Sequence, residues 1–86
     1  MPPDLTNLPG WAYDGRVITK EYRLASFRDA IGFINRIADL AEAADHHPTI
    51  ENTYNRVTIS LSTHSANAVT DKDTALAHQI ETLPGA

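Results

Sequence analysis

The 86-residue sequence contains no cysteine. This absence excludes disulfide frameworks, thiolate nucleophiles and cysteine-type zinc sites, and it fits a reducing compartment. Basic residues are also scarce, because 7 Lys and Arg stand against 11 Asp and Glu, for a formal net charge of −4. Such a balance disfavours the broad basic face that nucleic-acid backbones require, so we expect no direct nucleic-acid partner.

Long apolar runs are missing as well. No segment approaches the roughly 18 residues of a membrane span, and the start Met1-Pro2-Pro3-Asp4 has none of the features of a signal peptide. We therefore expect a soluble, cytoplasmic protein with no membrane partner. A chain of this size buries only about 60 to 65% of its unfolded surface, which excludes large cofactor folds. We expect a single domain over residues 1–86, with an irregular arm at 1–9 and the folded part at 10–84.

The first half of the folded part predicts a hairpin. Asp14-Gly15 is typical of a tight two-residue turn with positive φ values, between Trp11-Ala12-Tyr13 and the run 16–24. Within that run Ile18, Tyr22 and Leu24 alternate with polar residues, and Lys20 interrupts the apolar side. This alternation predicts a half-buried strand.

A helix is predicted next. Ser26 followed by Asp29 resembles a capping box, so the helix should begin at Phe27. Its apolar residues form one stripe at three- and four-residue spacing, namely Phe27, Ala30, Ile31, Ile34, Ile37, Ala38 and Ala41. Pro48 forces the helix to end near Ala44, and we expect the pair His46-His47 to cap its exit.

The second half predicts two more strands, over 49–54 and 56–63, joined around Asn55. Val57, Ile59 and Leu61 alternate strictly with polar residues. Thr70 and Asp73 resemble another capping box, and the helix that they begin runs until Pro84-Gly85 stops it. The order β-β-α-β-β-α predicts an α+β two-layer sandwich: a four-stranded antiparallel sheet with both helices on one face.

Three of the four histidines stand at element ends, as His46, His47 and His64. The unperturbed pKa of histidine, about 6.5, suits it to donate and accept protons near neutrality. Adjacent residues on extended backbone point to opposite sides, so His46 and His47 should have different roles. Asp45 is of interest because an acid at a helix C-terminus opposes the helix dipole.

The histidines also allow roles other than proton transfer. His46 could interact with the last helix carbonyls, His47 and His64 could be solvated, and His78 is expected at the surface. A metal site is disfavoured because His-Glu-x-x-His spacing and cysteine are both absent, and adjacent histidines on extended backbone chelate one ion poorly. Nucleophilic catalysis by Ser60, Ser62 or Ser65 is disfavoured because no Gly-x-Ser-x-Gly segment occurs.

Seven spaced residues resemble the signature of the pterin-4a-carbinolamine dehydratases, the family that also contains the dimerisation cofactor of a homeodomain transcription factor. They are Glu42, His46, His47, Pro48, Tyr54, His64 and Asp73. The resemblance extends over about residues 8–83 and includes Gly10-Trp11, Gly15-Arg16, Ile31-Gly32-Phe33, Asn52 and Ser62-Thr63-His64.

This resemblance implies the same two-layer fold and dehydration of a 4a-hydroxytetrahydropterin to the quinonoid dihydropterin, during pterin recycling for aromatic amino acid hydroxylases. It implies no metal or organic cofactor, and a homodimer or homotetramer. The implied catalytic residues are His46, His47 and His64. The implied substrate contacts are Asp45, His46, His47, Ser62, Thr63, His64 and Ser65, with Glu42, Asp73 and Trp11 as supporting residues.

From the chemistry, we expect His46 and His64 to exchange the acid and base roles, because the leaving hydroxyl needs a proton and the ring nitrogen must lose one. His47 would orient the pterin, and Asp45 would help to orient a histidine. The alternative is a non-catalytic module that stabilises a partner protein's oligomer.

Overall fold

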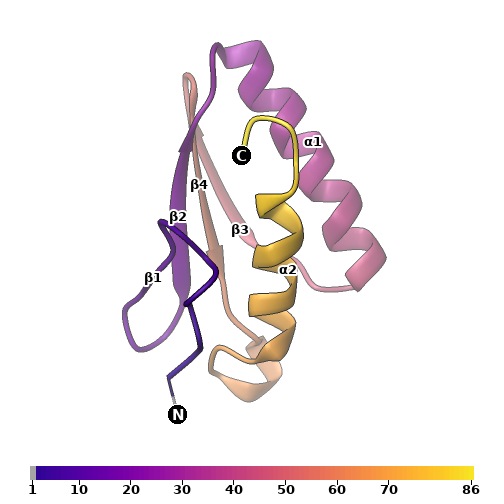
Figure 1. The fold of residues 1–86 in the computed structure, drawn as a ribbon. Coiled ribbons are helices and arrows are strands. Elements are labelled where there is room, and N and C mark those ends of the chain that lie inside the picture. The colour runs from indigo at the N-terminus through magenta and orange to yellow at the C-terminus, as the bar shows by residue number, and fades with distance from the viewer. Residues whose placement is uncertain (1) are drawn as a thin grey trace.

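The computed structural model describes residues 2–86, and Met1 lies outside the described residues. Its elements are, in chain order, β1 (Ala12–Tyr13), β2 (Ile18–Arg23), α1 (Phe27–Ala44), β3 (Thr49–Thr53), β4 (Arg56–Leu61), the short 3₁₀ helix η1 (His64–Ala66) and α2 (Asp71–Glu81). The strands form one antiparallel sheet in the order β1-β2-β4-β3. Both helices lie on one face of it (Figure 1). The predicted element order and α+β two-layer fold are confirmed.

The first turn differs from the prediction. Tyr13 pairs with Ile18, so residues 14–17 lie between the strands, and only Gly15 of the predicted pair has a positive φ, of 95°. The Asp14 side chain instead accepts the backbone N–H groups of Arg16 and Val17, at 2.8 and 2.9 Å. The two-residue turn was therefore wrong, because the side chain of Asp14 holds a longer loop.

Helix α1 begins at the predicted residue, and the Ser26 hydroxyl accepts the N–H of Asp29 at 3.1 Å. The predicted stripe is confirmed at Ala30, Ile37 and Ala41, which are buried. It was wrong at one edge, because Phe33 is fully buried while Phe27 is 52% and Ile31 38% exposed. The apolar surface of α1 is wider than the area that the sheet and α2 cover. The side that carries Phe33 packs against the sheet. One apolar flank of α1 is left uncovered within the described chain.

The exit of α1 is capped by Asp45 rather than by the histidine pair. Asp45 adopts a left-handed conformation with φ 50°, and its N–H bonds to the Glu42 carbonyl at 3.2 Å. The N–H of His46 bonds to the Ala41 carbonyl at 3.0 Å, which completes a Schellman-type ending. The backbone therefore turns sharply just before the histidines.

The later elements follow the prediction with shorter strands. β3 ends at Thr53, and the turn to β4 passes through Tyr54 in a left-handed conformation with φ 52°. β4 ends at Leu61, two residues before the predicted end. The capping box of Thr70 and Asp73 is complete at the start of α2.

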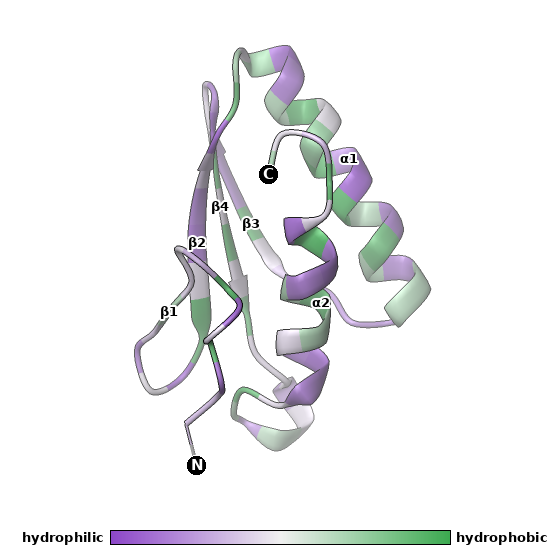
Figure 2. Ribbon diagram, viewed as in Figure 1, coloured by the Kyte–Doolittle hydropathy of each residue, from purple (hydrophilic) through white to green (hydrophobic). Residues whose placement is uncertain are grey.

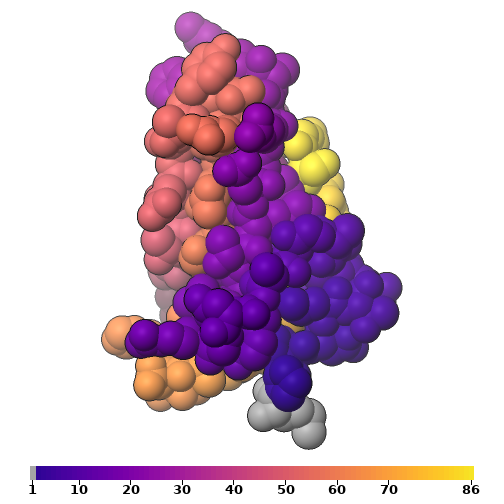
Figure 3. All heavy atoms as spheres, turned by 90° about the vertical axis from the view of Figure 1, so that its left-hand side faces the viewer, coloured from indigo at the N-terminus to yellow at the C-terminus, as the bar shows by residue number. Residues whose placement is uncertain are grey.

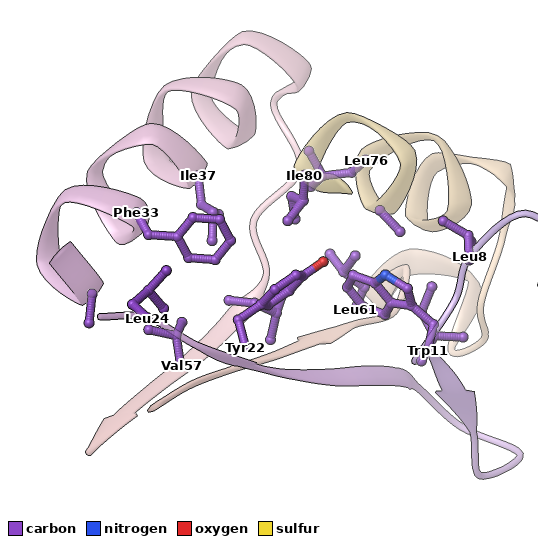
Figure 4. Packing of buried hydrophobic residues seen from close by; sticks show 14 residues of the cluster. Leu8, Trp11, Tyr22, Leu24, Phe33, Ile37, Val57, Leu61, Leu76 and Ile80 are labelled. Carbon is purple, nitrogen blue, oxygen red and sulfur yellow. The ribbon is translucent and has the colours of Figure 1, made fainter. Parts of the chain in front are cut away.

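The core lies between the sheet and the two helices (Figure 2), and Figure 4 shows Tyr22 at its centre between Phe33 and Trp11. The Tyr22 ring lies 4.9 Å from the Phe33 ring and 6.4 Å from the Trp11 ring, centroid to centroid. Leu8 is only 2% exposed, so the N-terminal arm supplies a core residue that its proline-rich pattern did not predict.

The other face of the sheet carries no helix (Figures 1 and 3). The hydroxyls of Thr19 and Ser60 meet across β2 and β4 at 3.2 Å on this face. Among the described residues, no helix is long and apolar enough to cross a membrane.

Candidate active site

Three segments that are distant in the sequence meet at one end of the molecule (Figure 1). They are the connection that follows α1, the segment that follows β4, and the first turn of α2. Hydrogen bonds between His46, Thr63 and Asp73 join all three segments. The candidate site is therefore built where chain reversals bring element ends together.

His46 and Asp73 form the best-defined contact of this site. The His46 Nε2 lies 2.5 Å from Asp73 Oδ1, with the histidine side chain 12% exposed and the aspartate 0% exposed. An ionised carboxylate can only accept hydrogen bonds, so a neutral His46 that donates from Nε2 keeps Nδ1 unprotonated. The contact therefore fixes both the ring orientation and the nitrogen that is free to accept a proton.

The second oxygen of Asp73 is held by the fold. It accepts the Thr63 hydroxyl and the Thr70 backbone N–H, each at 2.8 Å. Because the Thr63 proton is used in that bond, Thr70 must donate to Thr63 across their 2.5 Å contact. Asp73 is thus both a helix-capping residue and the anchor of His46, with all its bonds formed inside the protein.

His47 and Asp45 face different surroundings. His47 Nε2 lies 2.8 Å from Glu42 Oε2, and both side chains are exposed, at 59% and 77%. His46 points inward and His47 outward, so the prediction that they face different sides is confirmed. The carboxylates in contact with the pair are Asp73 and Glu42, whereas Asp45 shapes the backbone.

His64 is exposed and begins η1, directly after the buried Thr63. It lines an open cleft of about 420 Å³ together with Ser62, Asn67 and the β1–β2 loop residues Asp14, Arg16 and Val17. The loop and the 62–67 segment lie side by side on the molecular surface (Figure 3). His46 and His47 do not line this cleft, so His64 is connected to His46 through Thr63 and Asp73 rather than by direct contact.

The cleft carries charges of both signs. The N–H groups of Val17 and Arg16 lower the pKa of Asp14, so this carboxylate stays ionised beside the Arg16 guanidinium. In the part of the chain that the structure describes, no three His, Asp or Glu side chains gather in a way that could hold a metal ion. The arrangement offers imidazoles, a carboxylate, a guanidinium and hydroxyls, which are groups suited to proton transfer and to binding a polar ring.

Trp11, a predicted supporting residue, lies in the core and not in this cleft. It is 6% exposed and packs edge-on against Tyr22. Its Nε1 is buried and has no hydrogen-bond partner within residues 2–86. Trp11 therefore supports the sheet that carries the β1–β2 loop.

A polar cluster next to Trp11 ties β2 to the end of α2. Glu81 accepts bonds from Lys20 Nζ, at 2.7 Å, and from the Tyr22 hydroxyl, while Lys20 also donates to the Pro9 carbonyl at 2.7 Å. Burial raises the pKa of Tyr22, and the Glu81 carboxylate raises it further. For Glu81, burial acts to raise the pKa, but the bonds from Lys20 and Tyr22 outweigh it and leave the pKa lowered.

Comparison with protein families shows to which family this chain belongs. The family of pterin 4 alpha carbinolamine dehydratases matches residues 2–83. The chain belongs to this family. The expected resemblance is therefore confirmed over nearly the whole chain.

Relatives of the dehydratase family match over most of their lengths. A provisionally named pterin-4-alpha-carbinolamine dehydratase of Thermomicrobium roseum is 44% identical over 79 residues, which are 92% of this chain and 85% of the relative. One from Chloroflexus aurantiacus is 46% identical over 81 residues, 94% of this chain and 87% of the relative.

Solved structures agree with the dehydratase fold. The transcriptional coactivator/pterin dehydratase from Brucella melitensis has a TM-score of 0.84 and 39% identity, over 90% of this chain and 84% of that chain. A pterin dehydratase-like protein identified as a RuBisCO assembly factor in the alpha-carboxysome has a TM-score of 0.71 and 21% identity, over 88% of each chain. The second likeness concerns the fold alone.

Five residues at the candidate site were not predicted as site residues. Asp14, Arg16, Val17 and Asn67 line the cleft of His64, and Thr70 completes the bonds around Asp73. Gly15-Arg16 was among the residues that resemble the family, and this could have pointed to the β1–β2 loop as part of the site. Nothing local signals Asn67, because its place in the cleft depends on how β1–β2 and η1 pack.

Proposed function

We propose that this protein dehydrates a 4a-hydroxytetrahydropterin to the quinonoid dihydropterin by histidine acid–base catalysis. The observation that carries the proposal is the buried Asp73 carboxylate, which holds His46 at 2.5 Å and is bonded through Thr63 to the segment that carries His64. Membership of the dehydratase family supports the substrate class.

The reaction needs two proton movements. The carbon–oxygen bond at C4a breaks as the hydroxyl takes up a proton and leaves as water. The neighbouring ring nitrogen loses its proton, and its electron pair forms the new carbon–nitrogen double bond. No electrons leave the pterin, so an acid and a base of near-neutral pKa suffice, each contributing about 10²- to 10⁴-fold.

In our proposal His46 is the base and His64 the acid. His46 donates from Nε2 to Asp73, which leaves Nδ1 to accept the proton from the ring nitrogen. Asp73 then stabilises the imidazolium that forms, as a carboxylate does beside a catalytic histidine. His64 is exposed in its cleft and can exchange its proton with water after each turnover.

The remaining groups would bind the substrate. His47 and Asp45 leave the helix beside His46, and Ser62 and Ser65 flank His64. Thr63 is buried and its hydroxyl is bonded to Asp73 and Thr70, so it would support the site and not touch the substrate. We propose that Arg16 donates hydrogen bonds to the pterin from across the cleft, because a guanidinium presents several donors in a fixed plane. Glu42 would orient His47 through its 2.8 Å contact.

A dehydration assay with a 4a-hydroxytetrahydropterin tests the proposal. We expect turnover to fall by about 10²- to 10⁴-fold in His46→Ala and in His64→Ala, and binding to weaken in His47→Ala. His78→Ala removes an exposed histidine of α2 and is the matched control, with unchanged turnover. Near wild-type rates in both His46→Ala and His64→Ala would falsify the mechanism.

The second candidate function is a protein-binding module. It is motivated by the RuBisCO assembly factor, which shares the fold. In this chain His46, His47 and His64 are all present and His46 is anchored by a buried acid, which favours the enzyme. A correctly folded protein with no rate above the uncatalysed background would reverse this preference.

We also propose at least a homodimer. Phe27 and Ile31 expose an apolar flank of α1, and β3 is an edge strand with unpaired backbone groups. A small domain gains stability by covering such surface with a second copy. Light scattering at micromolar concentration should give at least twice the chain mass, and a monomeric mass would contradict the proposal.

A further inference from the structure

A second hollow lies far from the histidines, at the opposite end of α1. It has a volume of about 400 Å³ and is bounded by the end of β2, the first half of α1 and the C-terminal residues Pro84 and Gly85. Figure 1 shows the C-terminal tail curling back between α1 and the sheet at this end. The 18 residues of α1 span about 27 Å, so this hollow and His46 lie at separate ends of the helix.

Three arginines line the hollow, namely Arg23, Arg28 and Arg36. They are three of the 7 basic residues in a chain whose formal net charge is −4. Arg23 has one acid partner, Glu21, at 3.3 Å and exposed to solvent, and neither Arg28 nor Arg36 forms an ion pair within residues 2–86. Such an excess of like charge is unfavourable in the absence of an anion.

Asp29 is the one carboxylate in the lining, so the three guanidinium groups outnumber it. The first turn of α1 adds further partial positive charge at the same end, from peptide dipoles. The hollow is thus a local basic site on an acidic protein. Within residues 2–86, the side chains of Arg28 and Arg36 form no hydrogen bond or ion pair that would account for this charge.

Gly32 lies next to one of these arginines. Arg28, Gly32 and Arg36 follow at four-residue intervals along one side of α1. A Cβ on Gly32 would lie 3.8 Å from Arg36 Nη1, so the guanidinium folds back over the glycine towards Arg28. This distance is ordinary van der Waals contact, so an alanine would also fit beneath the guanidinium.

The opposite wall is apolar and closely fitted. Gly85 has φ 94°, and a Cβ there would approach Leu24 Cδ1 to 2.8 Å. Within the tail, the bond from Ala86 N–H to the Leu83 carbonyl, at 3.1 Å, closes a turn around Gly85. The hollow therefore combines guanidinium donors on one side with apolar groups on the other, within the size range of small-molecule sites.

We propose that this hollow binds a small ligand that carries a phosphate group, at a site independent of the dehydratase cleft. Guanidinium groups match phosphate oxygens with paired hydrogen bonds, and several of them around one hollow favour a multiply charged oxyanion over a single carboxylate. Leu24 and Pro84 would contact the less polar part of the ligand.

Nuclear magnetic resonance titration of the ¹⁵N-labelled full chain tests this proposal, with inorganic phosphate, pyrophosphate and acetate as probes. Sodium chloride keeps the ionic strength constant, because surface charges are screened by salt. We expect saturable shifts confined to residues 23–36 and 84–86, with pyrophosphate binding at least about tenfold tighter than acetate. Acetate binding as tightly as pyrophosphate, or shifts spread evenly over the surface, would overturn the proposal.

Two double variants of equal charge locate the binding. Arg28→Gln/Arg36→Gln should weaken pyrophosphate binding at least about tenfold, while Arg56→Gln/Lys72→Gln, with both residues exposed and outside the hollow, should leave it within about twofold. Equal loss in both would mean attraction by net charge only and would overturn the site. Arg36→Lys keeps the charge and should still weaken binding, which covers the case of a poorly folded double variant.

Discussion

Asp73 and His46 lie 27 positions apart in the sequence, and their side chains meet at 2.5 Å with the aspartate fully buried. The same carboxylate closes the capping box of α2 through its bond from Thr70. Helix capping and histidine anchoring therefore use one side chain. A shift at the start of α2 would therefore disturb the contact that orients His46.

The first prediction concerns this shared role. Asp73→Asn keeps the size of the side chain but removes the charge that stabilises a protonated His46, so kcat should fall by about 10- to 1000-fold with KM little changed. Steady-state kinetics with a 4a-hydroxypterin measures both constants. Asp71→Asn, an exposed acid in the same helix turn, is the matched control. A changed KM with an unchanged kcat would mean that Asp73 acts on binding instead.

The second prediction concerns the cleft of His64. Arg16→Ala should raise KM about tenfold and lower kcat less, because it removes a proposed binding group and not a proton-transfer group. Arg56→Ala removes an equal charge from outside this cleft and should leave both constants unchanged. If kcat alone fell in Arg16→Ala, the arginine would belong to the chemical step.

The third prediction separates the backbone role of Asp45 from its side-chain role. Its φ of 50° suits glycine, so Asp45→Gly should stabilise the fold by about 0.5 to 1 kcal/mol. Turnover should nevertheless decrease, because the substrate contact proposed for the carboxylate is lost. Thermal unfolding and the dehydration assay measure the two effects. Tyr54→Gly, at a second left-handed position with φ 52° that lies outside the cleft of His64, is the control for the backbone effect alone.

The fourth prediction concerns acid stability. Glu81 has a lowered pKa in the folded protein, relative to its ordinary value of 4.5, so its contribution is present above about pH 4.5 and is lost as the pH falls through the folded pKa. Glu81→Gln should therefore flatten the decrease of Tm with pH below that value. Glu51→Gln, on the exposed strand β3, should keep the wild-type slope. An unchanged slope in Glu81→Gln would show that its bonds to Lys20 and Tyr22 add no pH-dependent stability.

The local patterns of the chain predicted its elements well. Ser26 and Thr70 marked both helix starts, and the alternation around Ile59 marked β4, because caps and periodicities depend on residues a few positions apart. The turn at Asp14 was predicted less well. Asp14-Gly15 is compatible with a tight two-residue turn and also with a longer loop in which the Asp14 side chain accepts backbone N–H groups. The choice between the two depends on how β1 and β2 pair, which the local sequence does not specify.

The sequence by itself determined the order of the elements, the family and the presence of three histidines at element ends. Only the tertiary structure decided that Phe33 is buried while Phe27 is exposed, that Asp73 anchors His46, and that Arg16 shares a cleft with His64. The physical reason is that periodicity and capping act within one turn or one strand. Contacts between side chains of different elements depend instead on how the helices and the sheet pack, because the packing decides which face of each element is buried.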